Sequence, residues 1–146
     1  MKKPLSPEEF KDIYSKVPRL TVEVLLINKN NILLANRSIY PYKGFWHVPG
    51  GTVYYKEKVE NAVIRVADKE LGLKVKAERF VGFIHYPELI DNYGWDWPIG
   101  AAYLVSIISG KIKGSSEGKK VKYFNKLPDK IIPSQKEFII NHKLVK

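Results

Sequence analysis

A carboxylate occurs at the end of an apolar helical stripe in the middle of this chain. At helical spacing one face carries Val59, Ala62, Val63 and Val66, and Glu70 falls on that same face. An unpaired charge on a buried face costs more free energy than a fold can spare, so Glu70 needs a partner, and a divalent metal would supply it. The alternative is that the helix end is solvated and that Glu70 reaches into water.

Glycines flank this helix on both sides. Gly50 and Gly51 permit a backbone turn that bulkier residues resist, and Gly72 supplies a C-terminal stop. The stretch 50–73 therefore predicts a loop that leads into a helix.

The same stretch resembles the signature of the Nudix hydrolases, G-x5-E-x7-R-E-U-x-E-E-x-G-U, in which U is a bulky apolar residue. The residues that match it in register are Gly51, Glu57, Arg65, Glu70, Gly72 and Leu73. Two positions depart from the signature: Val66 stands where it has the Glu after the Arg, and Lys69 where it has the first Glu of the pair. The resemblance implies an α/β fold, the Nudix-type α/β/α sandwich, with the box helix packed on a mixed sheet.

The two departures lower the number of carboxylates expected at the metal site. In an ordinary Nudix enzyme these carboxylates help to hold the magnesium ions that activate water, and the changes remove roughly three charge units from the site. A similarly reduced box is known in the GDP-mannose mannosyl hydrolases. The chain resembles that branch over about its first half, at 33–37, Pro41, Gly44, Trp46, 48–51, Glu57, Ala62, Arg65 and 70–73.

The resemblance implies a site for Mg²⁺ and a nucleotide sugar. It assigns the Gly50 carbonyl and Glu70 to the metal, and Arg37 and Arg65 to the diphosphate region. The planar donor fork of arginine suits phosphate oxygens. Two structural alternatives stay open: Arg37 as a surface residue paired with a carboxylate, and Arg65 as the partner of Glu57 in an ion pair that fixes the loop to the helix.

Two polar residues occur within apolar strand-like runs. Glu23 belongs either on the outer face of its strand or in a site, and by resemblance it corresponds to an Asp close to the nucleotide. Tyr103 resembles a Tyr near the diphosphate, although a core tyrosine is the equal alternative. The aromatic segment 40–46 either stacks on a base or sugar or packs under the sheet.

The general base of the mannosyl hydrolases has no counterpart in this sequence. That branch uses a His before the last strand for attack of water on the anomeric carbon, but 115–121 contains no His. Glu117 is the better local candidate, as base or as a further metal ligand, because a protonated Lys119 cannot accept a proton. His85, at the end of a predicted strand, is a second candidate. His47 is interpreted as shaping the glycine turn.

Sequence patterns also place the elements that must position these groups. Ser6, Pro7 and Glu9 form a capping box that predicts a helix over 6–16, and Ser134 with Glu137 indicates a second box and a helix over 134–144. Strands are expected at 21–27, 32–38, 74–85, 100–109 and 121–124, the first two joined as a hairpin. A loop is expected at 87–98.

Length and composition give independent bounds. A chain of 146 residues predicts a single domain, 1–146, with a sizeable core. It has no run of about 18 uncharged apolar residues, which argues against a transmembrane helix, and no apolar region follows its basic N-terminus, which argues against a signal peptide. Cysteine is absent, which excludes disulfides. We interpret the chain as cytoplasmic.

The net charge of +10 favours anionic partners such as nucleotides. Many of the lysines are scattered along the chain rather than clustered, and this pattern argues against a nucleic-acid partner. The resemblance also implies a homodimer formed with help from the N-terminal segment.

Three functional hypotheses follow. The first is a Mg²⁺-dependent hydrolase of nucleoside-diphosphate derivatives that resembles the GDP-mannose mannosyl hydrolases and releases free sugar. The second is a Nudix pyrophosphatase with replacement ligands such as Glu57 and Glu117, which would release sugar phosphate. The third is a catalytically idle Nudix domain that binds a nucleotide sugar or nucleic acid as a sensor.

Overall fold

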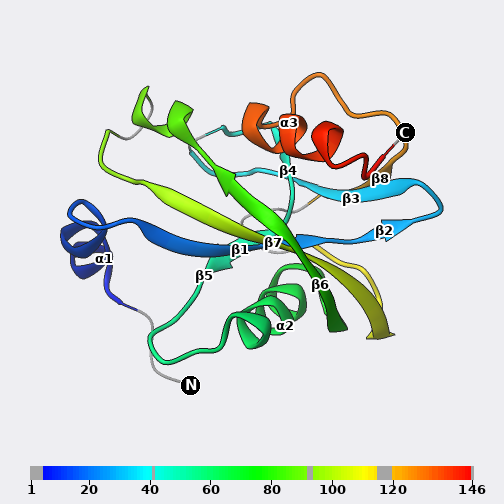
Figure 1. Ribbon diagram of the computed structural model, residues 1–146, viewed down its shortest axis with the longest axis horizontal. Coiled ribbons are helices and arrows are strands. Elements are labelled where there is room, and N and C mark those ends of the chain that lie inside the picture. The colour runs from blue at the N-terminus through cyan, green and yellow to red at the C-terminus, as the bar shows by residue number, and fades with distance from the viewer. Residues whose placement is uncertain (1–4, 41, 92–93, 115–119, 146) are drawn as a thin grey trace.

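The computed structural model of the chain describes residues 5–40, 42–91, 94–114 and 120–145 (Figure 1). The elements in chain order are α1 (Pro7–Tyr14), β1 (Arg19–Leu25), β2 (Ile27–Asn28), β3 (Asn31–Asn36), β4 (Trp46–His47), β5 (Gly50–Thr52), α2 (Val59–Leu71), β6 (Leu73–His85), the 3-10 helix η1 (Pro87–Asp91), β7 (Pro98–Gly110), β8 (Lys120–Phe124) and α3 (Pro133–Asn141). Helices α2 and α3 lie on opposite sides of the strands, and α1 lies at one end (Figure 1).

The described strands form two sheets. One has the order β5-β1-β7-β6 and is mixed, because β1 and β7 run parallel while the other pairs are antiparallel. In the other sheet β3 pairs with β2, β4 and β8, always antiparallel. The predicted α/β fold with a mixed sheet is confirmed.

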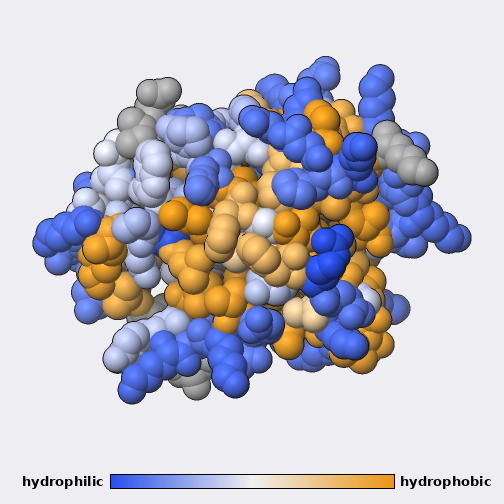
Figure 2. Space-filling model, in the orientation of Figure 1, coloured by the Kyte–Doolittle hydropathy of each residue, from blue (hydrophilic) through white to orange (hydrophobic). Residues whose placement is uncertain are grey.

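Two hydrophobic clusters hold the layers together. One joins α2 to the mixed sheet and includes Val22, Val63 and Val66, and the other joins α3 to the strands and includes Leu34 and Ile139. Helices α2 and α3 therefore pack on opposite sides of the strands, while part of β6 and β7, with Phe83 and Ile108, stays exposed (Figure 2).

The strand predicted over 21–27 is divided between the two sheets. Its main part, β1, pairs with β5 and β7, and its last residue, Ile27, belongs to β2 and pairs with Ile32 of β3. Of the expected hairpin, only the end next to the turn is therefore present, where β2 pairs with β3. Strand propensity identifies an extended run, but it carries no information about which sheet each residue joins.

The two expected capping boxes have different outcomes. Ser6 Oγ accepts from Glu9 N–H at 3.2 Å and the Glu9 side chain accepts from Ser6 N–H at 3.1 Å, so the first box is confirmed. The second is wrong: α3 is capped at Ile132, without a side-chain cap bond, and ends at Asn141 rather than 144. Ser134 Oγ instead donates to the carboxylate of Glu88 on η1, at 2.5 and 2.6 Å.

Within the described ranges, no helix has the length and apolar character needed to cross a membrane.

Candidate active site

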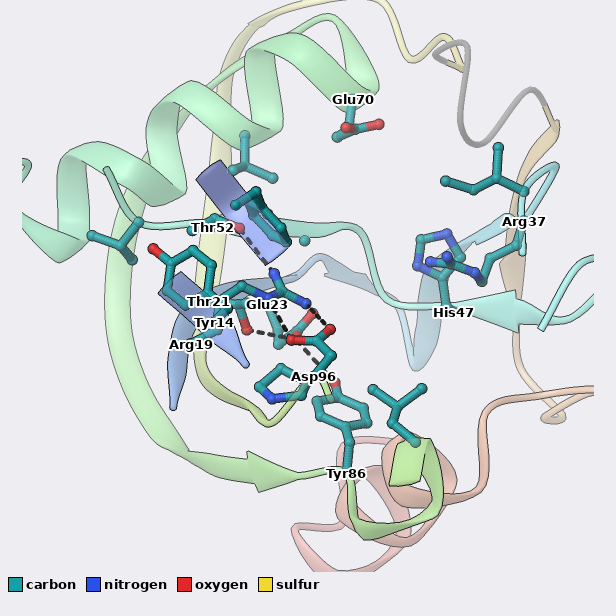
Figure 3. A pocket seen from close by; sticks show the side chains of 18 of the residues that line it. Tyr14, Arg19, Thr21, Glu23, Arg37, His47, Thr52, Glu70, Tyr86 and Asp96 are labelled. Atoms are coloured by element: carbon teal, nitrogen blue, oxygen red, sulfur yellow. Dashed lines mark hydrogen bonds and ion pairs between the residues drawn. The ribbon is translucent and has the colours of Figure 1, made fainter. Parts of the chain in front are cut away.

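A cavity of about 990 Å³ opens between α1, β1, β5 and the C-terminal end of α2 (Figure 3). Charged side chains line the cavity, among them Arg19, Glu23, Arg37, Lys69, Glu70 and Asp96. Aromatic side chains, among them Phe10, Tyr14 and Trp95, line the part next to α1. The cavity therefore offers both positive groups for phosphates and ring faces for a nucleobase.

Strand alternation on β1 directs three polar residues into this cavity. Successive side chains of a strand point to opposite faces, so Arg19, Thr21 and Glu23 line the cavity while Val22 and Val24 pack in the core beneath α2. Of the two alternatives open for Glu23, the structure places it in the cavity. This face of β1 is the floor of the candidate site.

Gly50 and Gly51 leave room for neighbouring atoms that approach them closely, and they do not form a turn. Residues 50–52 form β5, in which Gly50 lies opposite Glu23 of β1. A Cβ on Gly50 would clash with Oε2 of Glu23 and would lie 2.7 Å from the backbone oxygen of Val22, and one on Gly51 would lie 3.0 Å from Cγ2 of Val66. Neither glycine is among the positive-φ residues of the described ranges, so the expected turn is wrong and a short strand replaces it.

Helix α2 brings Glu70 to the cavity. The helix buries Ala62, Val63 and Val66 against the sheet and stops at Gly72, whose φ of 69° is the left-handed conformation of a C-cap. Glu70 lies in the last turn, half-buried, and lines the cavity (Figure 3). Lys69 also lines the cavity, so a cation replaces a carboxylate of the usual box at the site itself.

Arg65 makes the ion pair that was one of its two expected roles. Its Nε and Nη2 donate to the two carboxylate oxygens of Glu57 at 2.8 and 3.0 Å, and Nη2 also donates to the carbonyl of Thr52 at 2.7 Å. The guanidinium lies 3.7 Å from the ring centroid of Tyr54. Hydrogen bonds from Arg65 lower the pKa of Glu57. The pair ties the loop after β5 to α2, and Arg65 still lines the cavity.

A chain of buried hydrogen bonds orients Glu23. Gln135 accepts from Val48 N–H at 2.7 Å and donates to Tyr86 Oη at 2.8 Å, and Tyr86 donates to Glu23 Oε1 at 2.9 Å. Thr21 Oγ1 lies 3.3 Å from the same oxygen. Burial raises the pKa of Glu23 to about 7, against the opposing effects of the bonds from Tyr86 and Thr21 and of the charges on Arg19 and Arg37.

The buried carboxyl predicts a pH-dependent stability. The pKa of Glu23 rises from 4.5 in the unfolded chain to about 7 in the folded one. Below pH 4.5 both states hold the proton, and from there to pH 7 only the unfolded state loses it. Stability should therefore fall by roughly 3 kcal/mol across this window and then level off.

Urea unfolding of the wild type and Glu23→Gln at pH 4.5 and pH 8, in EDTA, measures this effect. The difference between the two pH values should be smaller in the variant by roughly 3 kcal/mol. An identical difference in both proteins would contradict the assignment.

Sequence reasoning missed an ion pair in the cavity. Arg19 donates through Nε and Nη2 to both carboxylate oxygens of Asp96, at 3.0 and 2.8 Å, and through Nη1 to Thr52 Oγ1 at 2.9 Å. Its guanidinium also lies 5.3 Å from the ring centroid of Phe10 on α1. Arg19 thereby connects β1, β5 and the segment before β7, and it also contacts α1. The partners are 77 positions apart in the sequence, so no local pattern could reveal the pair.

His47 is a second residue of the cavity whose surroundings the sequence does not reveal. It lines the cavity beside Arg37 (Figure 3). Its Nδ1 lies 2.9 Å from the carbonyl oxygen of Val48, and its buried Nε2 has no hydrogen-bond partner among the described residues. Burial and then the charge of Arg37 lower the pKa of His47 to about 4. The available sequence signal was its position three residues before Gly50.

Three expected site residues are not placed in this cavity. His85 is exposed and precedes Tyr86, whose ring is in the cavity, so alternation directs His85 away from it. Tyr103 packs on the α2 side of β7, where its hydroxyl donates to Glu60 at 3.3 Å. Glu117 lies outside the described residues. The aromatic segment 40–46 contributes Tyr40 and Tyr42 to the lining.

The described donors suit a metal bound together with substrate. Among these residues no three His, Asp or Glu side chains gather as a complete metal cage. The Gly50 main chain and the Glu70 carboxylate both border the cavity, and they supply oxygen donors of the kind that Mg²⁺ prefers. Magnesium commonly takes one or two carboxylates and completes its shell with water and substrate phosphates, and this donor set fits that pattern.

Comparison with known proteins gives three findings. Residues 17–113 match the family model described as NUDIX domain. The chain is 32% identical over 120 residues to the low-salt glycan biosynthesis protein Agl8 of Haloferax volcanii, covering 80% of this chain and 77% of that protein. It is 33% identical over 113 residues to an ADP-ribose pyrophosphatase of Methanocaldococcus jannaschii, covering 76% of this chain and 65% of that protein.

The fold is also similar to the crystal structure of a MutT NUDIX hydrolase from Burkholderia pseudomallei. The two superpose with a TM-score of 0.73 and 24% sequence identity. The match covers 89% of this chain and 99% of that one, so the likeness extends well beyond the box.

Proposed function

This chain belongs to the NUDIX family, and from that premise we propose that it hydrolyses nucleoside diphosphates joined to a sugar, with Mg²⁺ as cofactor. The observation that carries the proposal is that one cavity combines Arg37, Glu70 and aromatic side chains on and beside α1. Arginine suits phosphate oxygens, and aromatic rings suit a nucleobase. The names of both relatives are compatible with a sugar-containing substrate.

The arrangement of the cavity supports an orientation for such a substrate. Phe10, Tyr14 and Trp95 offer ring faces to the base near α1. Glu70 and the Gly50 carbonyl would hold Mg²⁺ with the phosphates, and Arg37 would bind the phosphate oxygens. When bound, Mg²⁺ neutralises phosphate charge. Arg37 would in addition stabilise the negative charge that develops on the departing nucleoside diphosphate.

The reaction that we favour is attack of water on the anomeric carbon of the sugar. The bond between that carbon and the phosphate oxygen breaks, and the products are free sugar and a nucleoside diphosphate. The proton of the attacking water needs an acceptor. Glu23 is suited to this role within the described cavity because burial brings its pKa to about 7. Glu117, expected from the sequence as base or further metal ligand, is the alternative, and in that case Glu23 would take the place close to the nucleotide that the resemblance implies.

A second candidate reaction is cleavage of the diphosphate itself. The similarity to an ADP-ribose pyrophosphatase favours it. Its products would be a sugar phosphate and a nucleoside monophosphate. The reduced donor set of the described cavity, with Val66 and Lys69 in the box, favours the first reaction, because several magnesium ions would need more carboxylates.

Product analysis distinguishes these reactions. We expect purified protein to release free sugar from GDP-mannose or a related nucleotide sugar in Mg²⁺ and to release none in EDTA, with products identified by mass. ADP-ribose should be tested in parallel. Sugar phosphate in place of free sugar would establish the pyrophosphatase. Binding without any product would support an idle domain and overturn the proposal.

A further inference from the structure

His47 lines the cavity, and one of its ring nitrogens is a hydrogen-bond acceptor without a partner among the described residues. Its Nδ1 lies 2.9 Å from the carbonyl oxygen of Val48. A carbonyl oxygen only accepts, so this contact assigns the ring proton to Nδ1 and leaves a lone pair on Nε2. That nitrogen is buried and has no partner among the described residues. A buried polar atom without a partner is unusual in a folded protein and calls for an explanation.

The surroundings of His47 restrict what can pair with Nε2. Arg37 lies beside the ring (Figure 3), and its charge, after burial, keeps the pKa of His47 low. A metal cation at Nε2 would be repelled by this guanidinium, whereas a neutral hydroxyl or amide N–H would not. The partner should therefore be a neutral donor that belongs to a molecule with an anionic group for Arg37.

The position of His47 within the cavity indicates which part of a substrate meets it. In Figure 3, Tyr14 and Thr52 lie at one side of the cavity, Glu70 lies near the end of α2, and His47 lies with Arg37 at the other side. A nucleotide whose base lies near α1 and whose phosphates lie near Glu70 would extend its sugar toward His47. Sugar hydroxyls adjoin a phosphate and are neutral donors.

We propose that Nε2 of His47 accepts a hydrogen bond from a hydroxyl of the substrate's sugar and thereby selects nucleotides that carry such a sugar. The inference rests on the proposed function, since it takes a nucleotide sugar as the ligand. His47 would then determine specificity for the sugar, because a nucleoside diphosphate without a sugar substituent does not bond to Nε2. Arg37 contacts the phosphates in both ligands, so its contribution should be common to both.

Equilibrium binding in EDTA, where turnover is prevented, tests this pairing. The ligands are GDP-mannose and GDP, with ADP-ribose and ADP as a second pair, and the variants are His47→Phe and His47→Gln. His47→Phe should weaken binding of the sugar nucleotide roughly tenfold and change the affinity for the nucleoside diphosphate less than about twofold. His47→Gln keeps an acceptor oxygen and should recover part of the loss.

His142→Phe is the matched control. His142 also pairs Nδ1 with a backbone carbonyl, that of Phe138 at 2.9 Å, but it follows α3 and does not line the cavity. Its substitution should leave all four affinities unchanged. In ¹⁵N-histidine NMR of the wild type, the Nε2 resonance of His47 should shift with GDP-mannose and not with GDP.

The outcomes separate the two proposals. Equal affinities of wild type and His47→Phe for the sugar nucleotide, or an equal loss for both ligands, would overturn the role of His47 while hydrolysis by the wild type still supports the function. If the wild type neither binds nor hydrolyses any nucleotide sugar, the proposed function fails first and the inference fails with it.

Discussion

Glu70→Gln should lower Mg²⁺-dependent turnover by roughly 100- to 1,000-fold, because a metal that stabilises transition-state charge contributes several kcal/mol. Glutamine keeps the size of the side chain and removes its charge. Glu70 is half-buried in the last turn of α2 and borders the cavity with Gly50, so the change acts on the proposed metal ligand. Initial rates across a magnesium titration would measure the effect, and urea unfolding would check that the fold is intact.

Asp68→Asn supplies a matched control on the same helix. Asp68 loses the same charge, but its side chain is 50% exposed and pairs with Lys74 at 2.8 Å. This variant should retain turnover within about twofold, since surface ion pairs contribute little. Wild-type rates and an unchanged magnesium requirement in Glu70→Gln would exclude Glu70 as the metal ligand.

Arg65→Met should lower the free energy of unfolding by about 3–5 kcal/mol, the usual cost of removing one partner of a buried ion pair. The carboxylate left behind belongs to Glu57, whose side chain is 0% exposed, while that of Arg65 is 23% exposed. The change also removes the hydrogen bond to the Thr52 carbonyl and the cation–π contact with the Tyr54 ring. Denaturant unfolding at neutral pH would measure the loss.

Two further variants identify the cause of this loss. Adding Glu57→Gln to Arg65→Met removes the uncompensated charge, so the double variant should be more stable than Arg65→Met alone. Lys74→Met breaks the exposed pair with Asp68 and should cost less than about 1 kcal/mol. If Arg65→Met unfolds like the wild type yet loses turnover, the diphosphate role expected from the sequence would replace the structural one.

Local signals in the sequence were sufficient to predict a helix end where a specific residue caps the helix. The capping box at Ser6 and the C-cap at Gly72 depend on residues a few positions apart, and both are present. Ser134 carried a similar signal, but a carboxylate 46 positions away, that of Glu88, takes its hydroxyl. A competing partner from another element cannot be recognised in a local pattern.

The resemblance named several residues that the structure brings to one cavity, whereas burial, which a sequence does not show, determines the chemistry of others. Glu70, Arg37 and Glu23 line one cavity, as residues of a common site should. The significance of His47 depends on a buried ring nitrogen without a partner in the described part of the chain, and this environment exists only once β4 is packed beside Arg37. The sequence offers His85, and not His47, as a candidate base, but strand alternation directs His85 away from the cavity.

The packing of Glu23 between two glycines links three positions on three strands. A Cβ on Gly100 of β7 would lie 2.6 Å from Oε1 and 2.8 Å from Cγ of Glu23, and both obstacles belong to that side chain. Gly50 faces the same side chain but also the backbone oxygen of Val22. Homologues with a shorter residue at position 23 should thus be free to carry alanine at 100, whereas position 50 should stay glycine in every lineage. An alignment of homologues should therefore show that the residues at positions 23 and 100 change together, while position 50 does not vary with them.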